Sequence, residues 1–267
     1  MTSPLRRLND EIDRHRQVLL EHYDEEGLHQ LRVTIRRLRV FLKHFDGQDA
    51  LDQRREWGRL MRFSNDARDW DTFINFARDA LTTEHFEALH PALLRHQEAG
   101  RRLALEVLRS KDWEEHVTRW HVFLDQAPDF GAADFELALT AARRDVGSAC
   151  SRACEKDNRK RWHKLRIAIK ALRYLVDSSP DLQAQHGELI SLCKQLQTDL
   201  GDWHDTVIHG KLLAQLVVSG DINNSLLPVA ERLTTVQARR GAECLARVRA
   251  TMSHRDISQA GTGFSKL

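Results

Sequence analysis

The chain has 267 residues, of which 41% are hydrophobic and 30% are charged, so it is apolar enough to fold around a sizeable core and is not disordered. Its 41 Lys and Arg nearly balance 39 Asp and Glu, and the formal net charge is only +2. Gross charge therefore predicts neither a nucleic-acid partner nor a membrane partner. Glycine (13) and proline (5) are scarce, which favours long helices.

The first residues carry charges throughout and include no hydrophobic stretch, so we expect no signal peptide. No apolar run approaches the roughly 18 residues of a membrane span. The cysteines form no CxxC motif, and we interpret them as reduced core thiols of a cytoplasmic protein. They are Cys150, Cys154, Cys193 and Cys244.

Helical periodicity runs along almost the whole chain, and no segment shows the alternation of a strand. Short breaks rich in turn formers and helix caps separate the predicted helices. The sequence therefore predicts an all-α fold. In chain order, the breaks lie near 24–27, 46–49, 82–84, 128–133, 157–159, 178–180 and 219–225.

A long motif occurs twice. HQLRVTIRRLRVFL begins at His29 and HKLRIAIKALRYLV begins at His163, an offset of 163 − 29 = 134 residues. The same offset pairs ARDWDT at 67–72 with GDWHDT at 201–206. One register kept over this distance indicates a duplicated helical unit.

A looser match follows the two motifs, because the Arg-Arg pair at 101–102 resembles the pair at 239–240 at an offset of 138. We therefore expect two antiparallel bundle-like repeats, 1–127 and 134–255, which together form one domain. The remaining residues, 256–267, are expected to be a tail.

Each copy of the motif forms a cationic stripe on a helical wheel, opposite an apolar face. No acidic residue occurs from 29 to 43 or from 163 to 173. Like charges at these spacings destabilise a helix by a few tenths of a kcal/mol per pair, whereas a solvated face usually mixes signs. Their recurrence favours a bound polyanion. The stripes are His29, Arg32, Arg36, Arg39 and Lys43, and His163, Arg166, Lys170 and Arg173.

These side chains suit phosphate. The arginine fork donates two parallel hydrogen bonds, lysine adds a point charge, and histidine adds an N–H donor whose charge responds to pH. The ladder from His29 to Lys43 rises about 21 Å along the helix axis. A single phosphate does not need that length, so we expect a chain of anions.

The two motifs resemble the signatures of the CHAD family, the conserved histidine α-helical domain. HQLRVTIRRLR at 29–39 is similar to H-x-L-R-V-x-x-R-R-L-R, and HKLRIAIKALRY at 163–174 is similar to H-x-L-R-I-x-x-K-x-L-R-Y. ARDWD and LQTDLGDWHD resemble the second helical element of the family. The departures are Asn65, where the first half usually has glycine, and Ala171, where the first repeat has Arg37.

The resemblance implies an all-helical fold with a basic groove or pore that binds inorganic polyphosphate, in a protein associated with polyphosphate granules. The resemblance implies that the residues of both stripes bind polyphosphate, except Lys43, which is predicted from its position on the helical wheel alone. Arg37 belongs to the motif but points about 80° off the stripe. The resemblance adds three basic positions on the next helix, Arg59, Arg62 and Lys194.

Two alternatives remain open. A nucleic-acid-binding protein could use the same groove, although the six tryptophans, interpreted as core, do not alternate with the cations as a base-stacking platform would. A metal-dependent phosphohydrolase could use His204, Asp205 and His209, but no HExxH, Walker A loop or nucleophile motif occurs. We therefore expect no enzymatic activity and no cofactor. Asp71 and Asp205 are expected to begin helices or to orient a basic partner.

Overall fold

The computed structural model describes residues 3–178 and 180–254, and every regular element in this part is a helix. The all-α fold predicted from the sequence is confirmed. Among the described helices, none combines the length and the apolar character that crossing a bilayer requires. The elements are α1 (Pro4–Glu21), α2 (Glu25–Phe41), η1 (Leu42–His44), α3 (Gln48–Leu60), η2 (Met61–Ser64), α4 (Asn65–Ala80), α5 (Thr83–Leu108), α6 (Lys111–Gln126), α7 (Ala132–Glu155), α8 (Arg159–Asp177), α9 (Pro180–Gln185), α10 (Gly187–Val218), η3 (Asn224–Leu226) and α11 (Leu227–His254).

The predicted breaks lie at observed helix ends, and polar caps account for several of them. Asp24 precedes α2, and its Oδ1 accepts a hydrogen bond of 2.7 Å from the backbone N–H of Gly27. The break between α5 and α6 was not predicted from the sequence. There Ser110 caps α6, because its Oγ accepts from the backbone N–H of Trp113 at 3.2 Å. A serine before a helix was the available signal.

The chain divides into two compact units that each combine an earlier and a later part of the sequence. Helices α10 and α11 contribute one part to each unit. The repeats expected at 1–127 and 134–255 come from sequence similarity and stay a prediction, and the expected tail at 256–267 lies outside the described residues. Unit 1 is Met1–Asp129 with Ile208–Gln237, and unit 2 is Phe130–Val207 with Ala238–Leu267.

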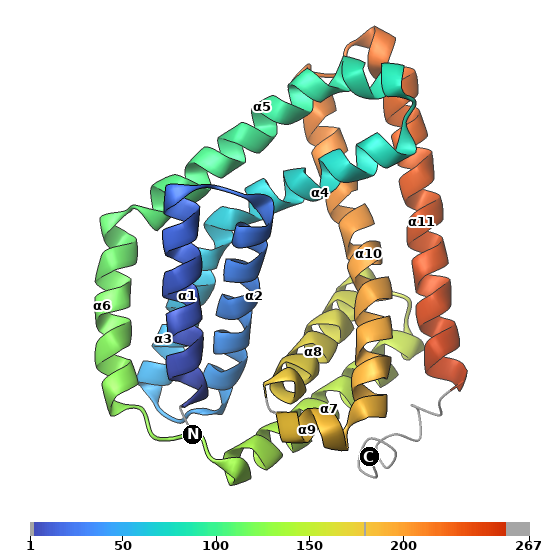
Figure 1. The fold of residues 1–267 in the computed structure, drawn as a ribbon. Coiled ribbons are helices and arrows are strands. Elements are labelled where there is room, and N and C mark those ends of the chain that lie inside the picture. The colour runs from blue at the N-terminus through green and yellow to red at the C-terminus, as the bar shows by residue number, and fades with distance from the viewer. Residues whose placement is uncertain (1–2, 179, 255–267) are drawn as a thin grey trace. The chain divides into compact units, whose positions relative to one another are not determined.

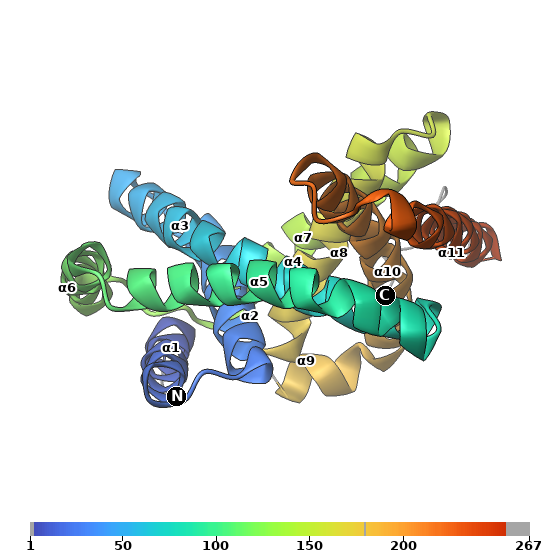
Figure 2. The ribbon, with the colours of Figure 1, turned by 90° about the horizontal axis from the view of Figure 1, so that it is seen from above.

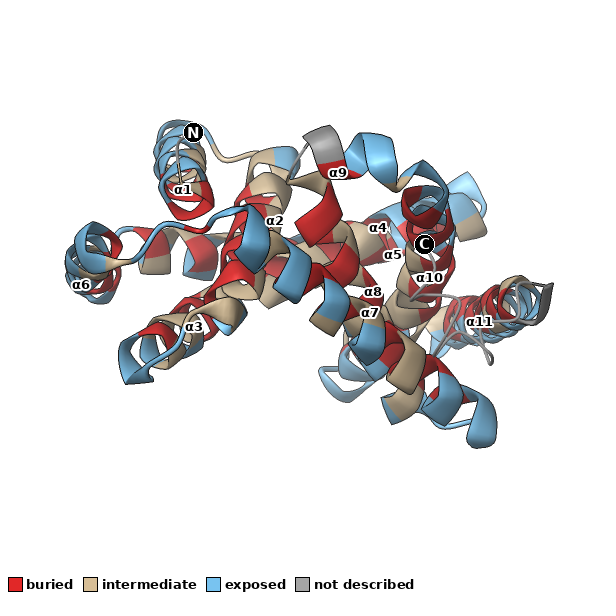
Figure 3. Ribbon diagram, turned by 90° about the horizontal axis from the view of Figure 1, so that it is seen from below, coloured by how far each residue is buried: buried red, intermediate tan, exposed pale blue. Residues whose placement is uncertain are grey.

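The first part of unit 1 is built on aromatic packing. Helices α1 and α2 form an antiparallel pair (Figure 1), and α1, α3 and α6 lie at one end of α5 (Figure 2). Trp57 of α3 meets Trp113 and Trp120 of α6 edge to face, with ring centroids 5.7 and 5.9 Å apart. Trp120 Nε1 donates to Asn9 Oδ1 of α1 at 2.9 Å. The buried residues of α1 and α6 lie on one side of each helix (Figure 3), as their amphipathic sequences require.

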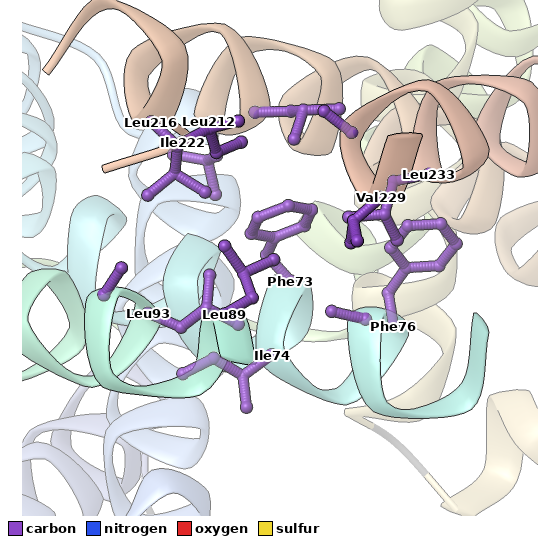
Figure 4. Packing of buried hydrophobic residues seen from close by; sticks show 14 of the residues in the cluster. Phe73, Ile74, Phe76, Leu89, Leu93, Leu212, Leu216, Ile222, Val229 and Leu233 are labelled. Carbon is purple, nitrogen blue, oxygen red and sulfur yellow. The ribbon is translucent and has the colours of Figure 1, made fainter. Parts of the chain in front are cut away.

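A second apolar cluster in unit 1 holds α4 in place. Phe73 of α4 packs with Leu89 of α5, and the unit 1 parts of α10 and α11 add Leu216 and Leu233 (Figure 4). All four side chains are fully buried. Helix α5 approaches α4 closely at Gly100, so the register of α4 is fixed on two sides.

Unit 2 is organised around the antiparallel pair α7 and α8. The apolar face predicted for the second motif is buried in α8, with Leu165, Ile169 and Leu172 fully inaccessible. Trp162 begins this face, and its Nε1 donates to Asp157 Oδ1 at 2.7 Å. The opposite face of α8 is thereby turned away from the core of unit 2.

Candidate anion-binding site

The first cationic stripe lies on α2, where the sequence predicts it. His29, Arg32, Arg36 and Arg39 all fall within this helix. Asp24 caps the helix, and Glu25 and Glu26 occupy its first turn, where acidic groups complement the helix dipole. Leu28, Leu31, Ile35 and Leu38 are buried on the other side.

Arg32 departs from the prediction because it is not on an open face. It is only 5% exposed, and its Nη1 donates to Ser64 Oγ at 2.6 Å. Ser64 lies in η2, which packs against α2, so a tertiary contact that a helical wheel does not show covers this cation. Burial, with Arg36 and Arg68 nearby, lowers the pKa of Arg32 to about 9. Arg32 therefore remains a cation at neutral pH, in an environment that opposes its charge.

Arg39 also packs against a neighbouring helix. Its Nε donates to the backbone oxygen of Arg54 at 3.0 Å. A Cβ at Gly58 of α3 would lie 2.7 Å from Arg39 Nη2, so the missing side chain of Gly58 leaves room for the guanidinium. Burial first, and then Arg54, Arg36 and Arg62, lower the pKa of Arg39. This places Arg62, a predicted site residue, close to the stripe.

Two further cations, Arg68 and Arg54, lie near these residues, and neither was predicted from the sequence. Burial first, and then Arg68, lower the pKa of His29, and Arg54 acts on Arg39 in the same direction. The available signal for Arg68 was its place in the repeated ARDWDT segment. Asp69 is the carboxylate among the strongest electrostatic neighbours of Arg32, and it raises the pKa of that guanidinium. We call the following residues the first cationic cluster: His29, Arg32, Arg36, Arg39, Arg54, Arg62 and Arg68.

Three other residues of unit 1 that were predicted to bind the anion lie outside the first cationic cluster. Lys43 is exposed in η1, where the α-helical wheel that placed it on the stripe no longer applies. Arg37 is partly buried. Arg59 donates to Glu56 Oε2 at 2.7 Å and to Asp112 Oδ2 of α6 at 2.7 Å, and these hydrogen bonds raise its pKa. Because two carboxylates of the protein hold Arg59, the structure does not bring it into the first cationic cluster.

Asp71 has a fully buried side chain, and it orients basic and amide groups. Its Oδ1 accepts from Gln97 Nε2 at 2.8 Å and from Arg101 Nη2 at 3.2 Å. Arg101 also pairs with Glu25 Oε1 at 2.6 Å. The expectation of a basic partner is met at Asp71, but the expectation that it begins a helix is wrong, because it lies within α4. Asp205 likewise lies within α10.

The second cationic stripe lies on α8 in unit 2, and all four of its predicted residues fall within that helix. His163, Arg166 and Lys170 are partly exposed. Arg173 is different, because its Nε donates to Asp177 Oδ2 at 2.9 Å one turn later. The protein therefore already neutralises Arg173, the last cation of this stripe. Lys194, the further basic residue predicted for the site, is exposed on α10.

His204 of α10 lies beside this stripe. Its ring centroid is 5.0 Å from that of His163, with the ring planes tilted by 34°. Burial first, and then Arg166, His163, Lys170 and Arg159, lower the pKa of His204 to about 3. Burial, Arg166 and Lys170 also lower the pKa of His163. We call the following residues the second cationic cluster: Arg159, His163, Arg166, Lys170 and His204.

The structure gives no support to the residues behind the two alternative functions. Within 3–178 and 180–254, no group of three or more His, Cys, Asp or Glu residues is arranged to hold a metal ion. His209 is buried, and its Nε2 lies 3.2 Å from Thr72 Oγ1. All six tryptophans are buried and so form no stacking surface. Three cysteines are buried as expected, but Cys154 is exposed and is not a core thiol.

Comparisons with known proteins agree on the fold. The family model of the CHAD domain matches residues 5–214. The crystal structure of the CHAD domain from the plant Ricinus communis superposes with a TM-score of 0.70 at 21% identity, over 98% of this chain and 89% of that one. PptA from Streptomyces chartreusis superposes with a TM-score of 0.72 at 16% identity, over 94% of this chain and 97% of that one. No curated protein is a significant match in sequence.

Proposed function

The chain belongs to the CHAD domain family, which is known in polyphosphate-associated proteins, and on that premise we propose that it binds inorganic polyphosphate through the two cationic clusters. The protein acts as a binding protein without a cofactor and without catalysis, and through the bound polymer it is targeted to polyphosphate granules or organises them.

The observation that carries this proposal is the buried charge of Arg32. A guanidinium that is 5% exposed has a neutral serine hydroxyl as its hydrogen-bond partner, and Arg36 and Arg68 repel it while Asp69 attracts it. Its Nε is buried and lacks a hydrogen bond within the described protein. Desolvating a charge is unfavourable unless an opposite charge compensates it. A phosphate bound beside this cluster would supply that charge.

The dimensions of the stripes suit a polymer of phosphates better than a single ion. From His29 to Arg39 the α2 stripe rises about 15 Å, and from His163 to Lys170 the α8 stripe rises about 10 Å. Cations recur every three or four residues along both helices. Each cluster thus presents several donors in a row, a pattern suited to successive phosphates.

The test is a binding titration with long-chain polyphosphate at physiological salt. Arg36→Ala combined with Lys170→Ala removes one central cation from each cluster, and we expect at least a tenfold loss of affinity. The matched control is Arg119→Ala with Lys164→Ala, which removes the same net charge from exposed positions of α6 and α8 outside the clusters. Equal affinity in the two double variants would contradict the proposal.

Competition and salt separate polyphosphate from other polyanions. Excess single-stranded nucleic acid should fail to displace polyphosphate, because the six tryptophans are buried and offer no surface for base stacking. Affinity should fall steeply with salt as phosphates release condensed counterions, a law established for nucleic acids whose sign carries over. Displacement by nucleic acid at low concentration would favour the nucleic-acid alternative, and phosphate release by the purified protein would favour a hydrolase.

A further inference from the structure

His204 belongs to neither of the two stripes predicted from the sequence, but its side chain lies within the second cationic cluster. It comes from α10, whereas the stripe comes from α8, and its ring is 5.0 Å from that of His163. Both imidazoles are partly exposed, so both are accessible to a ligand. Two helices therefore bring two titratable rings to one cationic surface.

The charges around His204 are mostly positive. Helix α8 contributes Arg159, His163, Arg166 and Lys170, in addition to the effect of burial. On its own helix, Asp202 and Asp205 are close in sequence, and Asp202 pairs with Arg240 of α11 at 3.7 Å. The free protein thus keeps both imidazoles neutral at physiological pH, and the cluster carries fewer charges than it has basic side chains.

We propose that His204 is a phosphate-contacting residue of the second cationic cluster and that, together with His163, it couples polyphosphate binding in unit 2 to proton uptake. This inference rests on the proposed function and adds to it a residue and a form of regulation. The polyanion itself is the group that favours the charged imidazoles.

The sign follows from linkage. Neighbouring cations and burial depress the pKa of each ring in the free protein, and a bound polyanion raises it. Between those two values the complex holds more protons than the free protein, so affinity rises as pH falls through that window. Internal phosphates of a long chain stay ionised there and far outnumber the terminal groups that titrate near pH 6, so the ligand charge is nearly constant.

The first cluster has no equivalent of this pair. At the repeat offset of 134 residues, His204 corresponds to Trp70, since 204 − 134 = 70. Trp70 is buried and stacks on His96, with ring centroids 4.6 Å apart. Proton uptake on binding should therefore be larger in unit 2, which has two such imidazoles, than in unit 1, where His29 alone has a lowered pKa within the first cluster.

The experiment measures long-chain polyphosphate affinity at pH 6 and pH 8 for the wild type and for His204→Gln, which keeps an N–H donor but cannot become charged. A ring restored on binding to its ordinary pKa of about 6.5 gives about a fourfold gain in affinity from pH 8 to pH 6. We expect His204→Gln to lose about that factor from the pH ratio. The control is His121→Gln, at an exposed position of α6, which should keep the wild-type ratio.

A second measurement does not depend on a variant. Imidazole nitrogen NMR spectra of the wild type, with and without long-chain polyphosphate, should show the pKa of His204 rising on binding. If the wild type binds at neither pH, the proposed function and this inference both fail. If the wild type binds but His204→Gln keeps the wild-type pH ratio, or the His204 resonances do not move, the inference alone is wrong.

Discussion

The two cationic clusters grow from the same sequence motif, but they hold their charge in different ways. In unit 1 the arginines of α2 are partly or almost fully buried, and helices α3 and α4 and the η2 turn add cations to those of α2. In unit 2 the last arginine of the stripe is paired with Asp177, and two neutral imidazoles stand beside the remaining cations. The motif thus specifies which face of a helix is basic, whereas the neighbouring helices decide how much of that charge a ligand meets.

The two units also differ in how far an ion pair is buried, and this difference gives the largest expected effect. Asp71→Ala removes a fully buried carboxylate and leaves Arg101 and Gln97 with Glu25 Oε1 as their remaining acceptor. We expect a loss of about 3 kcal/mol or more in the free energy of unfolding. Asp202→Ala breaks an exposed pair with Arg240 and should cost less than about 1 kcal/mol. Urea unfolding of both variants checks this, and equal losses would contradict it.

The next effect comes from comparing His116 of unit 1 with His204 of unit 2, two histidines whose pKa values are lowered. His116 lies fully buried 4.6 Å from the ring of Trp57. Burial is the largest cause that lowers its pKa to about 4; Arg119 and Arg59 lower the pKa further, whereas Glu56 and Asp112 raise it. The unfolded chain, with a pKa near 6.5, binds more protons than the folded protein between those values. Stability should therefore fall as pH falls from about 6.5 to about 4, by up to about 3 kcal/mol from this residue.

The test of this prediction is His116→Phe, which keeps an aromatic ring but cannot take up a proton. The free energy of unfolding of this variant should depend less on pH between 4 and 6.5 than that of the wild type. His121→Phe, on the exposed side of the same helix, is the control and should keep the wild-type slope. Polyphosphate should leave the pKa of His116 unchanged, unlike that of His204. A wild-type slope in His116→Phe would show that other groups control the acid response.

The fold and the core followed from the sequence because they depend on local patterns. Periodicity predicted all-α structure, and turn formers predicted most helix ends. The burial of Leu31 and Leu165 followed from their positions on the wheel, and the tryptophans were recognised as core. Each of these inferences uses only residues that are near one another in the chain.

The candidate site was less predictable because its environment is tertiary. One helical wheel cannot show that Ser64 covers Arg32, or that Asp112 holds Arg59 from 53 residues away. Nor can it show that Arg68 and His204 approach the stripes from other helices. The sequence identified which side chains could bind an anion, and packing decides which of them remain available.

The difference between the stripes also predicts unequal effects on binding. Arg36 lies at the centre of the first cluster, and loss of a charge-assisted hydrogen bond costs about 1.5–3 kcal/mol, so Arg36→Ala should weaken polyphosphate binding at least tenfold. Arg173→Ala should weaken it less than about threefold, because Asp177 already neutralises that guanidinium. Titration of the two single variants at one salt concentration decides this. A larger loss for Arg173→Ala would mean that the ligand displaces Asp177.

The smallest effect is a gain of affinity in unit 2. Asp177→Asn removes the negative charge that lies 2.9 Å from Arg173 Nε and makes the guanidinium available to phosphate. We expect about a twofold increase in polyphosphate affinity, in keeping with the modest energy of a partly exposed ion pair. The salt dependence of binding should become steeper, because one more cation would neutralise a phosphate.

A double-mutant cycle shows whether this gain comes from Arg173. Arg173→Ala should have little effect in the wild type but should abolish the gain in the Asp177→Asn background, since the two changes act on one interaction. If Asp177→Asn increases affinity equally with and without Arg173, the gain comes from the general loss of a negative charge. In that case the second stripe ends at Lys170, and the C-terminal turn of α8 contributes to folding and not to binding.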